Sequence, residues 1–420
     1  MILRTCTLTC IVALLAFSWV WANWPSFRGP TGNGHASPQA QPPLRWSAQE
    51  NVAWKVELPG PGNSTPAVWN ERIFLTQALD KQRHQRALLC LDRRTGKELW
   101  RRVVRYEEDE PTHRDNPACS ASPATDGQRV VVSYGSAGIY CYDLQGNQLW
   151  HYATGKIHHI WGNAASPIIH DGMVFLNCGP GERTFLVALD LATGREVWKV
   201  DIPGGKFGEK PSDWLGAWST PAIVRVGHRD LLVASWPEFL AAYEPKTGKE
   251  VWRCTGLGRL VYTSPVVSPE VVVISCGYGG PALAVRPEGQ GDVTKSHRLW
   301  RTEERNPQRI GSGILLGDYF FQPNAGPAGS VHCLEWRTGK VLWNERLGDA
   351  FWGSMVYAAD RLYVTDRRAV TYVLKPAAKF ELLAKNELDG ATTHATPVIV
   401  DDMVLIRTWT HLWCLREKSQ

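Results

Sequence analysis

The stretch EPKTGKEVW, residues 244–252, decides the fold because variants of it recur along the whole chain. In each variant an acidic residue precedes a tight Gly turn, and a Trp follows the Gly by four positions. The acid can accept hydrogen bonds from backbone N–H groups of the turn, and Gly can adopt its positive φ. The variants span Asp92–Trp100, Asp143–Trp150, Asp190–Trp198, Glu244–Trp252 and Glu335–Trp343.

A second signal starts each repeat, namely a Ser or Thr, usually before Pro, that opens an alternating apolar stretch. Pro is tolerated at the start of a strand because the backbone hydrogen-bond ladder does not yet need its N–H. No single repeat can bury its apolar faces alone, so the repeats must stack. We therefore predict an all-β, eight-bladed β-propeller of four-stranded antiparallel blades. The starts are at Thr65, Ser122, Ser166, Thr220, Ser264, Ser312, Ser354 and Thr396.

The eighth repeat lacks its last strand, and a spare strand lies near the other end of the chain. Asn51–Lys55 resembles the closing strand Lys249–Arg253. We expect the N-terminal strand to complete the last blade, with Trp54 beside the strand around Leu412, because closure removes both free sheet edges. In the seventh repeat Leu382 stands where Trp is expected. The Trp residues expected to wedge between blades are Trp54, Trp100, Trp150, Trp198, Trp252, Trp300 and Trp343.

The beginning of the chain predicts export. Arg4 precedes the apolar stretch Leu8–Trp21, which is shorter than a membrane-spanning helix needs, and Ala22 ends a plausible cleavage site. We divide the chain into a signal peptide at 1–22, an N-terminal lead-in at 23–50 and the propeller at 51–420. The predicted product is a soluble periplasmic or extracellular monomer that meets the membrane only through its signal. Its net charge of +5 is scattered, which argues against a nucleic-acid surface.

Ten cysteines in an exported chain raise the question of disulfides. Cys6 and Cys10 lie in the signal. One repeated position carries Cys in four repeats and Ala in two others, which indicates a small buried slot, so we expect free core thiols there. The slot holds Cys90, Cys141, Cys333 and Cys414. The other four could pair with one another in a way that the sequence leaves open: Cys119, Cys178, Cys254 and Cys276.

Candidate binding residues are those just before each first strand, which should surround the mouth of the central channel. Rings beside amides and imidazoles could hold a flat ring, a sugar or a peptide, or the Trp residues could simply fill the channel. The set is Asn63, Asn116, His159, Trp161, Asn163, Asp213, Trp214, Trp218, Tyr262, Trp352 and His394. We predict no catalytic residue and no metal site, since His158 and His159 would point to opposite faces of one strand.

The acid-x-x-Thr-Gly-x-x-x-Trp repeats resemble the PQQ-like (quinoprotein-type) β-propeller family over essentially everything after the signal. The resemblance implies an architecture shared by quinoprotein dehydrogenases, which oxidise alcohols with PQQ and Ca²⁺, and by BamB, which uses the ring as a docking platform without a cofactor. The dehydrogenases carry two adjacent cysteines beside the quinone, and no Cys-Cys pair occurs here. No Cys-x-x-Cys-His haem motif occurs either.

These observations favour a non-catalytic exported scaffold or binding module that binds a protein or envelope component through one face and the channel mouth. No cofactor is predicted on this interpretation. One alternative is a quinoprotein-like oxidoreductase with PQQ and Ca²⁺ in the central channel. The second alternative is a carbohydrate-binding propeller. Because one fold hosts many functions, the site must decide among the three.

Overall fold

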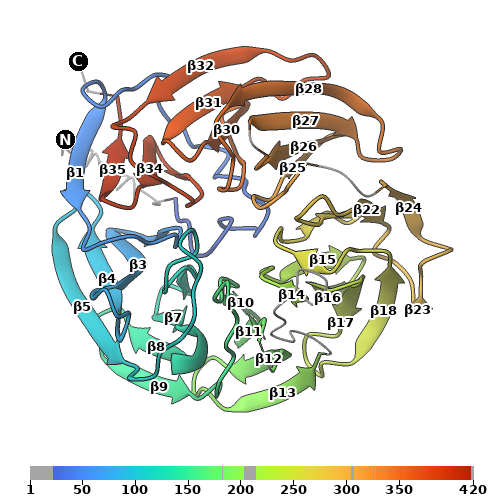
Figure 1. Ribbon diagram of the computed structural model, residues 1–420, viewed down its shortest axis with the longest axis horizontal. Coiled ribbons are helices and arrows are strands. Elements are labelled where there is room, and N and C mark those ends of the chain that lie inside the picture. The colour runs from blue at the N-terminus through green and yellow to red at the C-terminus, as the bar shows by residue number, and fades with distance from the viewer. Residues whose placement is uncertain (1–21, 182, 203–213, 304–306, 327, 418–420) are drawn as a thin grey trace, which may run out of the picture.

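Eight antiparallel sheets surround a central axis in the computed structural model (Figure 1). The structure describes residues 22–181, 183–202, 214–303, 307–326 and 328–417. The predicted eight-bladed propeller is confirmed. The only helix of the described part is the short 3-10 turn Gly135–Ala137, and none there is long or apolar enough to cross a membrane. Of the predicted signal peptide, only Ala22 is among these residues.

The first four blades follow the chain order. Blade 1 contains β2 (Ala67–Trp69), β3 (Arg72–Ala78), β4 (Gln85–Asp92) and β5 (Glu98–Arg105). Blade 2 contains β6 (Ala124–Thr125), β7 (Arg129–Ser133), β8 (Ile139–Asp143) and β9 (Gln148–Tyr152). Blade 3 contains β10 (Ile168–His170), β11 (Met173–Cys178), β12 (Phe185–Asp190) and β13 (Glu196–Asp201). Blade 4 contains β15 (Ala222–Val226), β16 (Arg229–Trp236), β17 (Phe239–Tyr243) and β18 (Glu250–Thr255).

The next three blades have the same form. Blade 5 contains β20 (Val266–Val267), β21 (Val272–Ser275), β22 (Ala282–Val285) and β24 (Arg298–Arg301). Blade 6 contains β25 (Ile314–Leu316), β26 (Tyr319–Asn324), β27 (Gly329–Glu335) and β28 (Val341–Gly348). Blade 7 contains β29 (Val356–Ala358), β30 (Arg361–Thr365), β31 (Val370–Leu374) and β32 (Leu382–Glu387). Two additions are β23 (Gly291–Asp292) on the edge of blade 4 and the parallel pair β14 (Gly216–Ala217) and β19 (Leu260–Val261).

Blade 8 is built from both ends of the chain, as predicted. It contains β33 (Val398–Val400), β34 (Met403–Arg407), β35 (His411–Leu415) and, as its outer strand, β1 (Val52–Glu57). Trp54 pairs with Cys414 and Val56 with Leu412 in antiparallel register. The ring is therefore closed by backbone hydrogen bonds between segments more than 350 residues apart.

The Ser and Thr residues that start the repeats form a closed circle of hydrogen bonds around the axis. The backbone N–H of each donates to the side-chain hydroxyl of the next, and Thr396 returns the circle to Thr65. The eight N···O distances lie between 2.8 and 3.1 Å. The side chains are almost fully buried, so each N–H has a partner where water could not serve.

The repeated Trp residues form a second set of links farther from the axis. In seven blades the indole N–H donates to a backbone carbonyl in the turn of the next blade, at 2.7–3.1 Å. Trp150, for example, donates to the Leu191 carbonyl and packs on Gly194. A Cβ on Gly194 would lie 2.5 Å from that ring, and the φ of Gly194 is +72°. Gly194 is therefore required twice, because it adopts the positive φ of the turn and leaves room for the Trp150 ring.

Blade 7 departs from the pattern in a way that differs from the prediction. The Trp of each other outer strand lies opposite the small slot of the third strand, as Trp100 lies opposite Cys90. In blade 7 Ala384 occupies this position, opposite Val373, beside the same β-bulge that the other blades have, as between Cys90 and Leu91. The preceding turn, residues 375–381, lacks the Gly of the repeat, and Leu382 is 43% exposed. Ala thus replaces Trp, and the larger Val replaces the usual Cys or Ala.

An aromatic ring from the lead-in packs beside this substituted position. Trp46 is 3% exposed and belongs to the same buried cluster as Val373 and Ala384. Its ring stacks on Tyr363 at a centroid distance of 6.4 Å, and its backbone N–H donates to the Asn386 side chain at 3.0 Å. We infer that Trp46 supplies the apolar bulk that blade 7 lacks.

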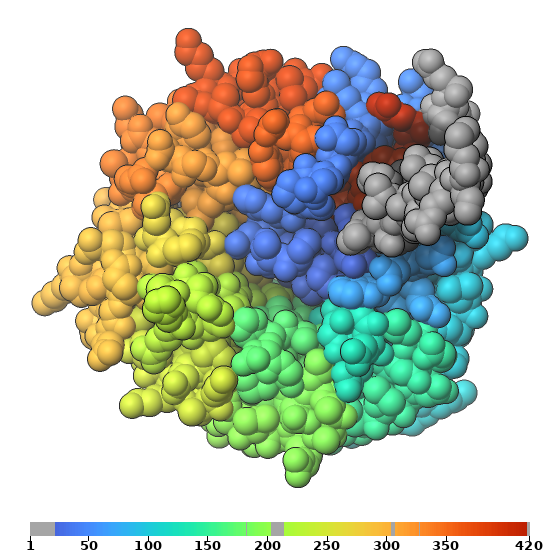
Figure 2. Space-filling model, turned by 180° about the vertical axis from the view of Figure 1, so that it is seen from behind, coloured from blue at the N-terminus to red at the C-terminus, as the bar shows by residue number. Residues whose placement is uncertain are grey.

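The lead-in also covers one face of the ring, where it crosses the centre (Figure 2). The Pro25 carbonyl accepts the Thr125 N–H of blade 2, and the Ala36 N–H donates to Tyr357 of blade 7. Between them the guanidinium of Arg28, 1% exposed, donates to the carbonyls of Ser312 and Gly313. Burial lowers the pKa of Arg28 to about 9. The sequence did not predict this crossing, because it depends on contacts distant in the chain.

All eight described cysteines are buried and free. The four slot thiols are thus core residues, as predicted. Cys119, Cys178, Cys254 and Cys276, for which pairing was left open, form no disulfide in the structure. Burial raises the pKa of Cys119 to about 12 and that of Cys254 to about 11. These thiols stay protonated and unreactive at neutral pH.

Replacing Trp46 tests its packing role. Trp46→Ala should lower the free energy of unfolding by about 3–5 kcal/mol, as for other buried Trp residues, measured by urea denaturation. Leu382→Ala, on the exposed side of the same blade, is the matched control and should change it by less than about 0.5 kcal/mol. Equal effects of the two substitutions would show that the lead-in does not support blade 7.

Candidate binding cup

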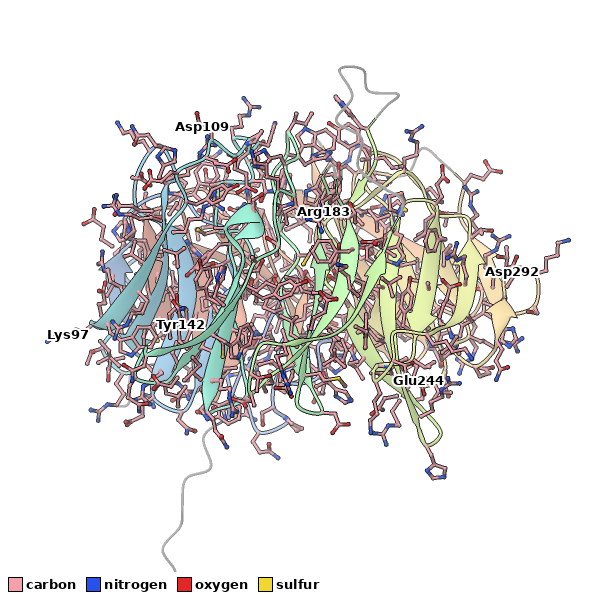
Figure 3. All side chains as sticks on the ribbon, turned by 90° about the horizontal axis from the view of Figure 1, so that it is seen from below. Lys97, Asp109, Tyr142, Arg183, Glu244 and Asp292 are labelled. Carbon is pink, nitrogen blue, oxygen red and sulfur yellow. The ribbon has the colours of Figure 1, made fainter. Side chains whose placement is uncertain are left out.

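The long connections between blades and the loops between second and third strands lie on the face opposite the lead-in. Asp109, after β5, and Arg183, after β11, lie toward this face, whereas Glu244, in the turn after β17, lies toward the other (Figure 3). We call the first the loop face. A cavity of about 620 Å³ lies in the centre of the ring, and we call it the cup. Phe27 of the lead-in and the eight Ser and Thr residues of the circle contribute to its lining.

The cup brings together seven of the residues predicted to surround the channel mouth. They are Asn63, Asn116, Trp161, Trp218, Tyr262, Trp352 and His394. His159 lies behind the lining, 1% exposed, where its Nδ1 accepts the Trp161 backbone N–H. Asn163 lines a separate small cavity and donates to the Pro180 carbonyl. Asp213 lies outside the described residues.

Aromatic side chains gather on the wall formed by the loops of blades 3 to 5. Trp161 stacks on Tyr278 at a centroid distance of 5.5 Å with nearly parallel rings, and it meets Trp214 edge-on at 4.7 Å. Trp218 lies 5.1 Å from Tyr262 and donates its indole N–H to the Gly162 carbonyl. The rings therefore line an open cavity and do not fill it.

The facing wall is held by a histidine in a fixed tautomer. The His394 ring stacks on Trp352 at 4.2 Å, and its Nδ1 lies 2.9 Å from the Asp115 carbonyl, so Nδ1 carries the proton. Asn63 donates to the same carbonyl and accepts the Trp409 indole N–H. Burial lowers the pKa of His394 to about 4, so the ring is neutral at neutral pH. Asn63 and His394 thus position the wall around Trp352.

Several lining residues were missed by the sequence analysis: Tyr278, His113, Asp115, Gln308, Asp349 and Arg367. The guanidinium of Arg367 makes no ion pair with any described residue. Tyr278 is 58% exposed at the tip of a Gly-rich loop and has a φ of +48°, which non-Gly residues rarely adopt. Gly277 before it has no Cβ, which would lie 2.0 Å from the Tyr262 ring. Of these residues only Tyr278 could have been predicted from the sequence, because a Tyr within a Gly-rich loop indicates an exposed aromatic side chain.

A long loop beside the cup carries an acidic run that is anchored at one end. Glu110 is buried and pairs with buried Arg86 at 2.7 Å, and it accepts the Ser136 N–H at 3.1 Å. Breaking such a buried pair typically costs about 3–5 kcal/mol, so the loop is held firmly. Glu107 and Asp109 before it remain exposed. The loop is therefore exposed at residues 107–109 and buried at Glu110.

The model of the family described as outer membrane protein assembly factor BamB matches residues 46–185, 182–315 and 327–418. This chain belongs to that family. A BamB from Burkholderia pseudomallei is 23% identical over 334 residues, 68% of this chain and 78% of that protein. Methanol dehydrogenase subunit 1 from Methylobacterium organophilum is 24% identical over 231 residues, 50% of this chain but only 33% of that protein.

Solved structures of a BamB and of a quinoprotein dehydrogenase both show the same fold as this chain. BamB from Moraxella catarrhalis superimposes with a TM-score of 0.53 at 21% identity, covering 78% of this chain and 86% of that one. Quinohemoprotein alcohol dehydrogenase from Comamonas testosteroni gives 0.68 at 13% identity, covering 95% and 81%. At these identities the likeness establishes the propeller and leaves the activity open.

Whether the cup could hold PQQ, the cofactor of the quinoprotein dehydrogenases, can be judged from the residues of its lining. PQQ carries three carboxylates, whereas the described lining offers one arginine, Arg367, and two aspartates, Asp115 and Asp349. Ca²⁺ takes six to eight oxygen ligands. No group of three or more His, Cys, Asp or Glu in the described part of the chain could hold a metal ion. The lining of this BamB-family member does not fit PQQ with Ca²⁺.

The buried histidines predict a specific pH dependence. Burial lowers the pKa of His159, His332 and His394 to about 4, whereas the same groups in the unfolded chain titrate near 6.5. Between these values the unfolded chain binds more protons, so the free energy of unfolding should fall as pH decreases from about 6.5 to about 4. Urea denaturation at several pH values measures the fall.

Substitution isolates the contribution of one ring. His394→Gln should make the fall with pH shallower, whatever it does to stability at pH 7, because one of the protonatable groups is gone. His228→Gln, at an exposed turn, should leave the slope unchanged. A slope that is identical in the wild type and the His394 variant would contradict the buried neutral ring.

Proposed function

We propose that this BamB-family propeller is an exported, non-catalytic scaffold that binds a protein or another cell-envelope component through its loop face. The observation that carries the proposal is that a long loop on this face is held in place beside the cup. The loop containing Glu107 to Asp109 is anchored by the buried Arg86–Glu110 pair, beside the mouth of the aromatic cup. A surface ordered before binding loses little conformational entropy when a partner docks.

The export part of the proposal rests on the sequence. The apolar stretch from Leu8 to Trp21 after Arg4 supports a signal peptide that is removed. The eight described cysteines are compatible with an oxidising compartment because each is buried and so protected from pairing. The similarity to BamB from Burkholderia pseudomallei, a named outer-membrane assembly factor, supports an envelope partner.

The competing function is a quinoprotein-like oxidoreductase, which the likeness to methanol dehydrogenase favours. The lining of the cup argues against it, because Arg367 alone faces the charges that PQQ would bring. The absence of adjacent cysteines argues in the same direction. We therefore expect purified protein mixed with PQQ and Ca²⁺ to retain no quinone absorption band after gel filtration and to show no dye-linked alcohol oxidation.

A charge-reversal experiment tests the scaffold. We expect the immobilised protein to retain a defined partner from envelope extract, and Glu107→Lys, Glu108→Lys and Asp109→Lys together to abolish its retention. The matched control reverses three exposed charges in turns of the other face, Arg94→Glu, Lys246→Glu and Lys340→Glu, and should retain it. Partners are identified by cross-linking and mass spectrometry. Equal retention by all three proteins, or retention by none, would contradict the proposal, as would a bound quinone with alcohol oxidation.

A further inference from the structure

The cup combines an aromatic wall with a polar wall, and this combination goes beyond what a docking face requires. The only aliphatic side chain larger than Ala in its described lining is Ile310. Ligand pockets are usually lined mainly by hydrophobic and aromatic side chains, with only a few polar groups. The cup instead pairs its rings with hydroxyl, amide, carboxylate and guanidinium groups.

Tyr278 is the most exposed part of the aromatic wall. It lies parallel to Trp161 at 5.5 Å, within 6.4 Å of Tyr262, and leaves 58% of its surface exposed at the mouth. An exposed aromatic held in a rarely populated backbone conformation suggests a functional constraint on that position. A ring so placed can stack on a flat apolar face of a ligand that enters the cup.

The polar wall retains both donors and acceptors. Arg367 has donors that no described residue engages in an ion pair. Asn116 uses its amide N–H to bond the Trp161 carbonyl at 2.5 Å, which leaves its Oδ1 as an acceptor. Asp349 accepts the Ala350 N–H at 2.7 Å and has further lone pairs. Such a mixture suits hydroxyl groups, which donate and accept at once.

The charges of the lining nearly cancel. Arg367 and Asp349 carry opposite charges without an ion pair between them, and Asp115 lies 3.6 Å from the guanidinium of Arg114. His394 is neutral because burial lowers its pKa to about 4. A ligand of high net charge would therefore meet charges of its own sign as well as of the opposite sign, whereas a neutral ligand needs no compensating charge.

The cup is covered at its far end. Phe27 of the lead-in contributes to the lining, and the lead-in crosses the ring there (Figure 2). A chain molecule can therefore insert an end and cannot thread through. The volume of about 620 Å³ lies in the range of roughly 300–1,000 Å³ that is typical of small-molecule sites, and it admits a few sugar rings.

We infer that the cup is a carbohydrate site that takes the terminal sugars of a neutral glycan. The apolar face of a pyranose stacks on Tyr278 and Trp161, and its hydroxyls bond Arg367, Asn116 and Asp349. A polypeptide end is the competing ligand. It is less suited, because its side chains find almost no aliphatic pocket.

The test is calorimetric titration of the purified protein with neutral oligosaccharides of glucose, galactose, mannose and N-acetylglucosamine. We expect one series to bind with a dissociation constant below about 1 mM. Its affinity should stop rising beyond about three sugar units, because further sugars would lie outside the cup. Failure of all four series to bind, or an affinity that keeps rising with chain length, would overturn the inference.

Variants locate the site. Tyr278→Ala and Arg367→Ala should each weaken sugar binding about tenfold, through loss of one stacking contact or one set of charged donors. Leu149→Ala, 47% exposed on the outer strand of blade 2, is the control and should leave the affinity unchanged. Unchanged affinity in both cup variants would overturn the inference. So would peptide-library binders that Tyr278→Ala abolishes in the absence of any sugar binding.

The outcome is separable from that of the scaffold experiment. Loss of partner retention in the Glu107, Glu108 and Asp109 variant concerns the rim of the loop face, whereas sugar affinity concerns the cup. The rim variant should bind sugar as the wild type does. A rim variant that loses both would show that the two surfaces are one site, which contradicts a separate carbohydrate site.

Discussion

The structure depends on a circle in which eight backbone N–H groups each find a hydroxyl in the neighbouring blade. The circle closes only when Thr396 meets Thr65, so its geometry admits one number of blades. Each hydroxyl comes from the residue that opens a first strand, which fixes how far every blade reaches toward the axis. Because the groups are buried, a break at one point leaves an unpaired donor that water cannot reach easily.

Farther from the axis, hydrogen bonds from the repeated Trp residues also join neighbouring blades. In seven blades the indole N–H bonds the turn of the next blade, and in four of these turns a Gly makes room for the ring, namely Gly96, Gly194, Gly248 and Gly339. The strand β1 extends the Trp links across the gap between the ends of the chain, since Trp54 bonds the Arg93 carbonyl of blade 1. Hydrogen bonds at two radii therefore hold the blades at a constant angle. A rigid ring of this kind can carry variable loops without changing its own shape.

Local periodicity in the sequence is sufficient to predict the repeats and the blade number, because both depend on residues a few positions apart. The closing strand pairs across the whole chain, but it could be predicted because Asn51–Lys55 repeats the pattern of a closing strand and the eighth repeat lacks one. Other contacts between distant segments could not be predicted. Nothing near Ala384 indicates that Trp46 joins its buried cluster, and the turn of blade 7 lacks the Gly that would have marked the register separating Ala384 from Leu382. The crossing of the ring by Arg28 was missed for the same reason.

The candidate site divides in a similar way. Residues directly before a first strand, such as Trp161 and Trp352, could be placed at the channel because the repeat fixes their position. Arg367 and Tyr278 could not, since they come from turns between second and third strands, whose length and course vary between blades. Asn163 and His159 have the expected position in the repeat but turn toward neighbouring loops and the core. Position alone does not determine the direction of a side chain.

Native-state hydrogen exchange of the eight amides in the circle tests its role most directly. If the circle acts as one unit, these amides exchange with a single opening free energy equal to that of global unfolding. Ser166→Ala, which removes the acceptor of the Ser122 N–H, should then lower the protection of all eight by the same amount. Lost protection at Ser122 alone, with the other seven unchanged, would show that the blades are held independently and would contradict the account.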